Sequence, residues 1–88
     1  MDAAIDIRPI KNGEYIYKAN LDEIHNGNVY YAIDLYKNGK YEKQVGKLII
    51  YSDGYAYAES KPQGEFLCEA NDATGIFPEF VRLHMELS

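Results

Sequence analysis

The residues of this sequence that could perform nucleophilic or metal chemistry are few and far apart. The chain contains two histidines, His25 and His84, and one cysteine, Cys68. A metal site needs several ligands that converge, and a nucleophilic cysteine needs a base beside it. Cys68 has no Cys or His close by in sequence, and its neighbours Phe66 and Leu67 favour a small buried side chain. We therefore predict no catalytic residue, no metal and no cofactor.

The glycines and the acidic residues do not change this view. The seven glycines are isolated, so the phosphate-binding and dinucleotide-binding patterns are absent. Fourteen acidic residues always provide a pair of carboxylates somewhere, so such a pair does not identify a glycosidase. We expect His25 to lie in a loop and His84 to face solvent. An enzyme is the least favoured class, and we expect a non-enzymatic protein.

Tyrosines and a short basic segment remain as features that could form a binding surface. Nine of the twelve aromatic residues are tyrosine, which combines a large rigid contact area with a polar end. Segment 37–47 contains four lysines and one acid, whereas the whole chain has a net charge of −5. Both features also have structural explanations, since the tyrosines could lie under another layer and lysines protect hairpin tips against aggregation. As residues that bind a partner, we predict Tyr30, Tyr36, Tyr41, Lys43 and Lys47.

A β-hairpin around Asn38-Gly39 would position these side chains. The segments 28–36 and 41–51 on either side are rich in β-branched and aromatic residues, and Asn-Gly between two such segments is the strongest local hairpin signal. A second tight turn at Ser52-Asp53-Gly54-Tyr55 extends the hairpin to a three-stranded meander over residues 28–59.

A two-residue loop fixes the register that we expect for the hairpin. It pairs Tyr36 with Tyr41, Asp34 with Lys43, Ala32 with Val45 and Tyr30 with Lys47 on one face. On the other face it pairs Leu35 with Glu42, Ile33 with Gln44 and Val29 with Leu48, and it places Tyr31 over Gly46 to shield the bare backbone. We expect the second face to lie in the core, which is formed by Val29, Tyr31, Ile33, Leu35, Leu48, Ile50, Val81, Leu83 and Met85.

The flanking segments are assigned from the same patterns. Residues 5–10 alternate up to Pro9 and predict an edge strand, residues 14–21 predict a second strand, and residues 22–28 predict a connection. Residues 65–73 fit a strand or a short helix, and we favour a short helix or an irregular segment. Residues 79–87 alternate strictly from Val81 to Leu87, which favours a final antiparallel strand.

Together these patterns predict a mostly β fold for residues 1–88 as a single domain. We expect one small antiparallel sheet of five to seven strands, strongly curved or closed into a barrel or sandwich, with one short helix within residues 60–78 as an option. The longest apolar run, residues 48–51, is too short to span a bilayer, and the start of the chain does not resemble a secretory leader. One unpaired cysteine suits a reducing compartment, so we expect a cytoplasmic protein.

The leading hypothesis for function is a small acidic protein-interaction domain. One specific form is an inhibitor or adaptor from a phage or mobile element that occupies a basic nucleic-acid site with phosphate-like acids, namely Glu59, Glu65, Glu69 and Asp72. The alternative is a β domain that binds a small ligand or single-stranded nucleic acid through surface tyrosines. The acidic balance argues against duplex nucleic acid, because that binding needs several cations. A homodimer through an edge strand or through the tyrosines is compatible with the sequence.

Overall fold

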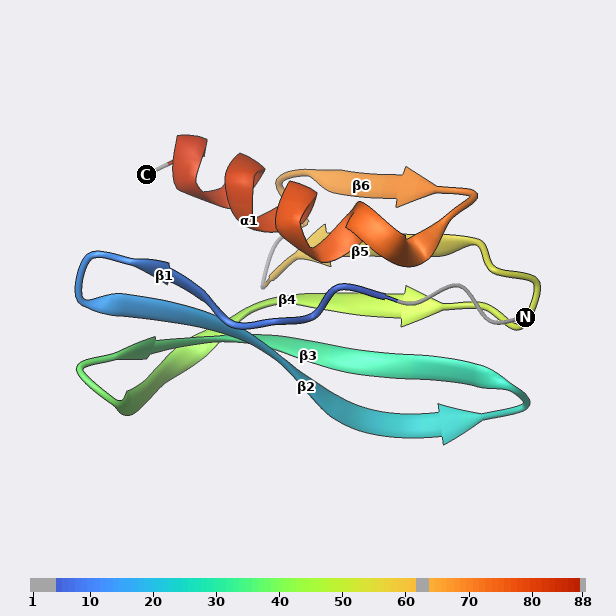
Figure 1. Ribbon diagram of the computed structural model, residues 1–88, viewed down its shortest axis with the longest axis horizontal. Coiled ribbons are helices and arrows are strands. Elements are labelled where there is room, and N and C mark those ends of the chain that lie inside the picture. Colours follow the sequence, from blue (N-terminus) through green and yellow to red (C-terminus); the bar gives the residue numbers. More distant parts are fainter. Residues whose placement is uncertain (1–4, 62–63, 88) are drawn as a thin grey trace.

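One curled antiparallel sheet and one C-terminal helix make up the fold (Figure 1), and the mostly β antiparallel class agrees with the prediction. The computed structural model describes residues 5–61 and 64–87. The strands neighbour one another in sequence order, β1 to β6, and every pairing is antiparallel. The elements are β1 (Ile10–Asn12), β2 (Tyr15–His25), β3 (Asn28–Lys37), β4 (Lys40–Ile50), β5 (Ala56–Ser60), β6 (Leu67–Ala70), the 3-10 helix η1 (Ala73–Gly75) and α1 (Ile76–Leu87).

The two faces of the sheet have different surroundings. Helix α1 and the extended segment 5–9 lie on one face, which we call the inner face (Figure 1). The amide nitrogen of Asp6 donates to the carbonyl of Thr74 at 3.1 Å, which ties the N-terminal segment to η1. Among the described residues, no helix or strand covers the opposite, outer face. The sheet is therefore a half-barrel that α1 and segment 5–9 fill from inside.

The core consists of rows of small and apolar residues that cross the sheet. In one row, Leu21, Tyr31, Leu48, Ala58 and Cys68 lie opposite one another on five successive strands. The small side chains on β5 and β6 leave room for α1, whose residues Phe77 and Phe80 are fully buried. The sequence predicted most of this core correctly: Ile33, Leu35, Leu48 and Val81 are buried, and Tyr31, Ile50, Leu83 and Met85 pack against them. Val29 is half-buried outside this cluster.

The predicted register of the central hairpin is right only at its tip. Tyr36 does pair with Tyr41, but two irregularities follow, at which β4 contributes one extra residue each. The extra residues are Glu42 and Val45, so Asp34 lies opposite Gln44 rather than Lys43. A β-bulge of this kind places consecutive side chains on one side of the strand and advances the register by one. Val45 is thereby turned into the core, where it is 1% exposed.

All pairs beyond the second bulge are displaced by two residues from the prediction. Val29, Tyr30, Tyr31, Ala32 and Ile33 lie opposite Ile50, Ile49, Leu48, Lys47 and Gly46. Because this shift is even, the residues of β3 keep the faces that were predicted for them. Between the two bulges the displacement is one residue, so Leu35 lies opposite Lys43 rather than Glu42.

The predicted final strand at 79–87 is wrong, because this segment belongs to α1. Alternation from Val81 onward suggested a strand, but the buried positions begin earlier, and Ile76, Phe77, Phe80 and Val81 recur at helical spacing. Pro78 is accommodated because it lies in the first turn, where the helix does not use its missing N–H. The polar residues of the second half form exposed ion pairs, in which Arg82 contacts Glu79 and Glu86 at 2.6 and 2.8 Å.

Three other boundaries also differ from the expectations. Segment 65–73 contains strand β6 rather than a helix, since its small residues pair with β5. Strand β2 continues through the predicted connection at 22–28 as far as His25, past an irregularity at Asp22, and the turn is Asn26-Gly27. The predicted edge strand at 5–10 is reduced to β1, which begins at Ile10, and residues 5–9 form no strand.

Gly46 lies where Phe80 of α1 packs tightly against the sheet. A Cβ atom on Gly46 would lie 2.3 Å from Cζ of Phe80 and 2.9 Å from the carbonyl oxygen of Glu59. The predicted contact of Tyr31 over this glycine is therefore wrong, and Phe80 from α1 covers the bare backbone instead.

Within the described ranges, α1 is also far too short to cross a membrane.

Candidate functional site

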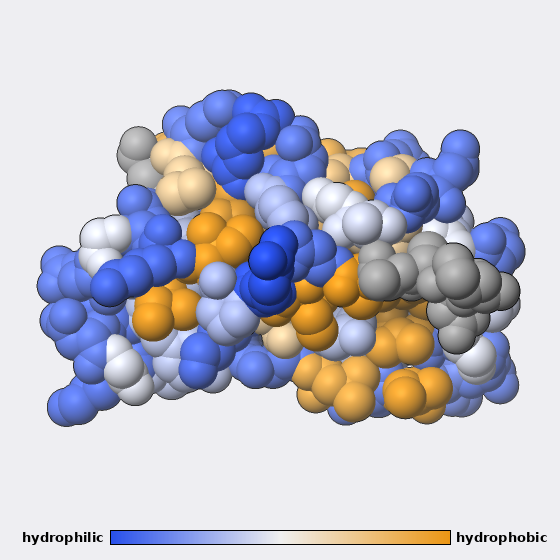
Figure 2. Space-filling view, in the orientation of Figure 1, coloured by the Kyte–Doolittle hydropathy of each residue, from blue (hydrophilic) through white to orange (hydrophobic). Residues whose placement is uncertain are grey.

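In the part of the chain that the structure describes, no element covers the inner face at the end where β2 turns into β3. Ile24, Val29, Ile50, Ala56 and Ala70 form a second row across five strands. The Ala56 end of this row is buried, whereas Ile24 is 66% exposed. Leu21, at the open end of the neighbouring row, is 60% exposed. Figure 2 shows hydrophobic surface gathered over this end of the β2–β3 hairpin, at the lower right.

The length of the helix explains why this surface is open. A strand of 11 residues such as β2 spans about 36 Å, whereas the 12 residues of α1 span about 18 Å. The helix therefore covers only about half the length of the sheet. Leu21 and Ile24 lie beyond it, although they belong to the same apolar rows as the core.

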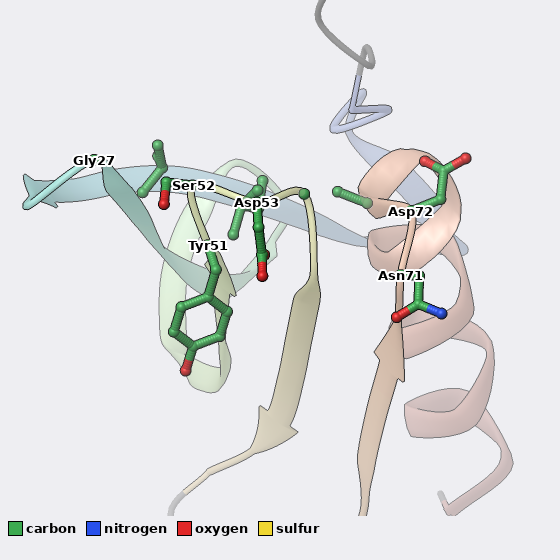
Figure 3. A pocket seen from close by; sticks show the side chains of 10 residues that line it. Gly27, Tyr51, Ser52, Asp53, Asn71 and Asp72 are labelled. Carbon is green, nitrogen blue, oxygen red and sulfur yellow. The ribbon is translucent and has the colours of Figure 1, made fainter.

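A groove with a volume of about 570 Å³ begins in the same row as Ile24, because Val29 and Ile50 line it (Figure 3). Three loops surround it: the β2–β3 turn, the β4–β5 turn, and the link from β6 to η1. Figure 3 shows Ser52 and Asp53 on one side of the opening and Asn71 and Asp72 on the other. We call this region, with Leu21 and Ile24, the hairpin-end groove; its lining residues are Gly27, Val29, Ile50, Tyr51, Ser52, Asp53, Gly54, Asn71, Asp72 and Ala73.

The rim of the groove is acidic, and local hydrogen bonds hold its carboxylates in place. Oδ1 of Asp53 accepts from the amide of Tyr55 at 3.0 Å. Oδ1 of Asp72 accepts from the amide of Thr74 at 2.9 Å and from its hydroxyl at 2.6 Å. These two bonds from Thr74 lower the pKa of Asp72 below its usual value, so this carboxylate is charged at neutral pH. The lining residues include no lysine or arginine, and the groove therefore favours a basic counterpart.

The predicted binding residues do not all share one surface. The outer face carries four of them, Tyr30, Tyr36, Tyr41 and Lys47. Across β3 and β4, Tyr36 lies opposite Tyr41, and Lys47 lies opposite Ala32 in the same alternation as Tyr30. The rings of Tyr36 and Tyr41 meet edge to face at 5.8 Å, and Tyr41 is 58% exposed. Lys43 lies opposite the inner residue Leu35, so the bulge at Glu42 has moved it to the other face. The tyrosines thus share the outer face with Lys47 but not with Lys43.

The outer face also brings together acids and tyrosines at its β5–β6 end. The hydroxyl of Tyr57 donates to Glu59, and that of Tyr55 donates to Glu69. The bond to Glu59 raises the pKa of Tyr57 to about 12. Two of the four acids considered as phosphate-like groups are therefore engaged with tyrosines on the outer face, whereas Asp72 lies at the hairpin-end groove. The four acids do not form one surface.

The histidines and the cysteine occupy three different environments. His25 ends β2 and is exposed beside the Asn26-Gly27 turn. His84 is half-buried rather than solvated, and its Nδ1 lies 2.8 Å from the hydroxyl oxygen of Tyr17. Cys68 is buried, as expected, and its burial raises the pKa of its thiol. In the part of the chain that the structure describes, no three His, Cys, Asp or Glu side chains converge as metal ligands.

Sequence reasoning missed the hairpin-end groove because it placed residues 22–28 in a connection. The signal was present, since Asn26-Gly27 has the same composition as the turn at Asn38-Gly39, and both asparagines have positive φ. Read as a hairpin, this turn places Ile24 in β2 opposite Val29. Comparison with family models, with curated proteins and with solved structures found no similar protein.

Proposed function

We propose that this chain is a non-enzymatic protein-interaction domain that binds a partner through the hairpin-end groove. One observation carries the proposal: Leu21 and Ile24 are 60% and 66% exposed, and Val29, the cross-strand partner of Ile24, lines an open groove. Exposed apolar surface that is rimmed by polar groups is typical of interaction sites. The partner inserts an apolar side chain into the groove and covers Leu21 and Ile24.

The apolar contact supplies the affinity. Burying the exposed part of each aliphatic side chain contributes about 1–2 kcal/mol. Both residues extend from a paired β-hairpin, so ordering them on binding costs little. An interface centred on them is expected to be weakened about 10-fold or more when one is truncated.

The acidic rim determines the kind of partner. Asp53 and Asp72 border the groove, and both are exposed. A partner with lysines or arginines around its apolar anchor complements these charges. Such rim pairs act mainly on the rate of association and on its salt dependence. A protein with a nucleic-acid-binding surface has this chemistry, which supports the inhibitor or adaptor form of the hypothesis.

The experiment is capture of partners by the full chain, followed by a binding titration with the captured protein. The variant Leu21→Ser with Ile24→Thr removes the apolar contact from two exposed positions and keeps a β-branched residue in the strand. The matched control is Leu67→Ser, which removes a side chain that is 53% exposed on β6. We expect the double variant to weaken binding at least about 10-fold and the control to leave it unchanged. Equal binding by the double variant would refute the assignment.

The tyrosine surface is the second candidate, and the same partner tests it. If Tyr36→Ala and Tyr41→Ala abolish binding while the Leu21 and Ile24 variant retains it, the contact surface is the outer face. That face also carries Lys18, whose ammonium lies 4.8 Å from the ring centre of Tyr36. A titration with single-stranded oligonucleotides at low salt tests whether such cation and tyrosine pairs bind nucleic acid, and light scattering tests the homodimer.

A further inference from the structure

A second pocket lies at the opposite end of the half-barrel, close to the β1–β2 turn. It has a volume of about 300 Å³, which is the lower end of the range for small-molecule sites. Tyr15, Tyr17 and Leu35 form its apolar wall. Its polar lining residues come from three different elements: Asn12 from β1, Glu42 and Lys43 from β4, and His84 from α1.

The bulge in β4 brings two opposite charges to this pocket. Glu42 is the unpaired extra residue between the Tyr41 and Lys43 pairings, so consecutive side chains of opposite charge line the same opening. Bulges are common beside binding sites because they redirect a side chain in this way. Among the described ion pairs, neither Glu42 nor Lys43 has a partner. Both side chains are exposed and are therefore available to a ligand.

One of the two charges, Lys43, acts on the histidine of the pocket. Lys43 lowers the pKa of His84, and Glu65 raises it, both less strongly than the effect of burial. The pocket therefore offers a cation, Lys43, and an anion, Glu42, at adjacent positions of β4. The Tyr17–His84 hydrogen bond of 2.8 Å fixes the wall of the pocket.

We propose that this pocket binds a small zwitterion with an apolar body, which is the chemistry of a free aromatic α-amino acid. The carboxylate of the ligand pairs with Lys43, and its ammonium group pairs with Glu42. The apolar body packs against Tyr15, Tyr17 and Leu35. This site lies on separate residues from the hairpin-end groove, so the two proposals stand or fall independently.

The test is an NMR titration of the isotope-labelled full chain with three matched probes. L-Phenylalanine carries both charges, 3-phenylpropionate lacks the ammonium group, and phenethylamine lacks the carboxylate. A ligand of this size in an open pocket is expected to bind with a Kd of about 1 mM. We expect phenylalanine to shift the resonances of Tyr15, Tyr17 and His84 saturably, and each of the other probes to bind about two- to fivefold more weakly.

Two charge-removing variants assign the roles. Lys43→Met should weaken the binding of phenylalanine and 3-phenylpropionate and leave that of phenethylamine unchanged. Glu42→Gln should weaken the binding of phenylalanine and phenethylamine and leave that of 3-phenylpropionate unchanged. The matched control is Lys40→Met, an exposed lysine of the same hairpin that does not line the pocket. The absence of a saturable shift would overturn the proposal. So would equal binding of all three probes, or a Lys43→Met effect that is the same for each of them.

Discussion

Replacing Gly46 by alanine tests the way in which α1 is seated on the sheet. The added methyl group would lie 2.3 and 2.8 Å from two ring carbons of Phe80 and 2.9 Å from the carbonyl oxygen of Glu59. Real Cβ atoms essentially never approach other atoms so closely. The carbonyl belongs to the paired strand β5 and the ring is fully buried, so neither can move without disturbing the core.

The size of the effect follows from overpacking. Forcing one extra carbon into a packed core costs about 1–3 kcal/mol. A chain of this size has a free energy of unfolding of about 5–10 kcal/mol, so the loss should be a large fraction of the total. The variant Phe80→Leu removes the ring and leaves space, at a cost of about 1–3 kcal/mol of its own. In the double variant the methyl group occupies part of that space, so the two costs should not add.

The measurement is urea unfolding of the four proteins, followed by circular dichroism and tyrosine fluorescence. We expect a coupling energy of at least about 1 kcal/mol between Gly46 and Phe80. Tyr31→Leu combined with Gly46→Ala is the control and should give nearly additive costs, because Tyr31 does not cover the glycine. A Gly46→Ala variant as stable as the parent, or additive costs with Phe80→Leu, would refute this account of the helix seat.

Three further predictions concern single sites. Burial, and to a lesser degree Lys43, hold the pKa of His84 below its ordinary value of 6.5, so the unfolded chain binds the proton first as the pH falls. The free energy of unfolding should therefore decrease from pH 7 to pH 5, and His84→Gln should flatten this slope in denaturant titrations. Gly39→Ala meets no atom within 4 Å but has φ of +83°, so unfolding should show a loss of about 1 kcal/mol that comes from the backbone alone. Cys68 should react with a thiol reagent at pH 7.5 much more slowly than in the urea-unfolded chain, and fast labelling of the folded chain would contradict its burial.

The turns and the strand order could be predicted because their signals are local. Asn38-Gly39 and Asp53-Gly54 lie at turns between strands, and they organise β3, β4 and β5 as the sequence indicated. The register could not be predicted, because it depends on the two bulges in β4, and no single residue type indicates where a bulge lies. The bulge at Val45 is favoured by burial of that side chain in the core, which is a property of the folded sheet.

The helix was missed for a physical reason that also applies to other short segments. Val81, Leu83, Met85 and Leu87 alternate with polar residues, but only Val81 is buried. The pattern that forms the core includes Phe77 and Phe80, and α1 packs against β5 and β6, where small residues such as Ala58 leave room. Tertiary packing thus decided between two periodicities that the segment carries at once.

Together with the connection predicted at 22–28, the strand predicted at 79–87 concealed the surface that we propose to be functional. With a final strand at 79–87, the apolar rows would have been closed by sheet along their whole length. Because α1 is about 18 Å long and a strand such as β2 is about 36 Å long, the apolar rows extend beyond the part of the sheet that the helix covers. An apolar row that no described element buries favours aggregation or binding. Leu21 and Ile24 lie at that end, where Asp53 and Asp72 of the groove favour a basic partner. The exposed charges of Asp22 and Glu23, on the same edge of the sheet, oppose pairing with a second sheet.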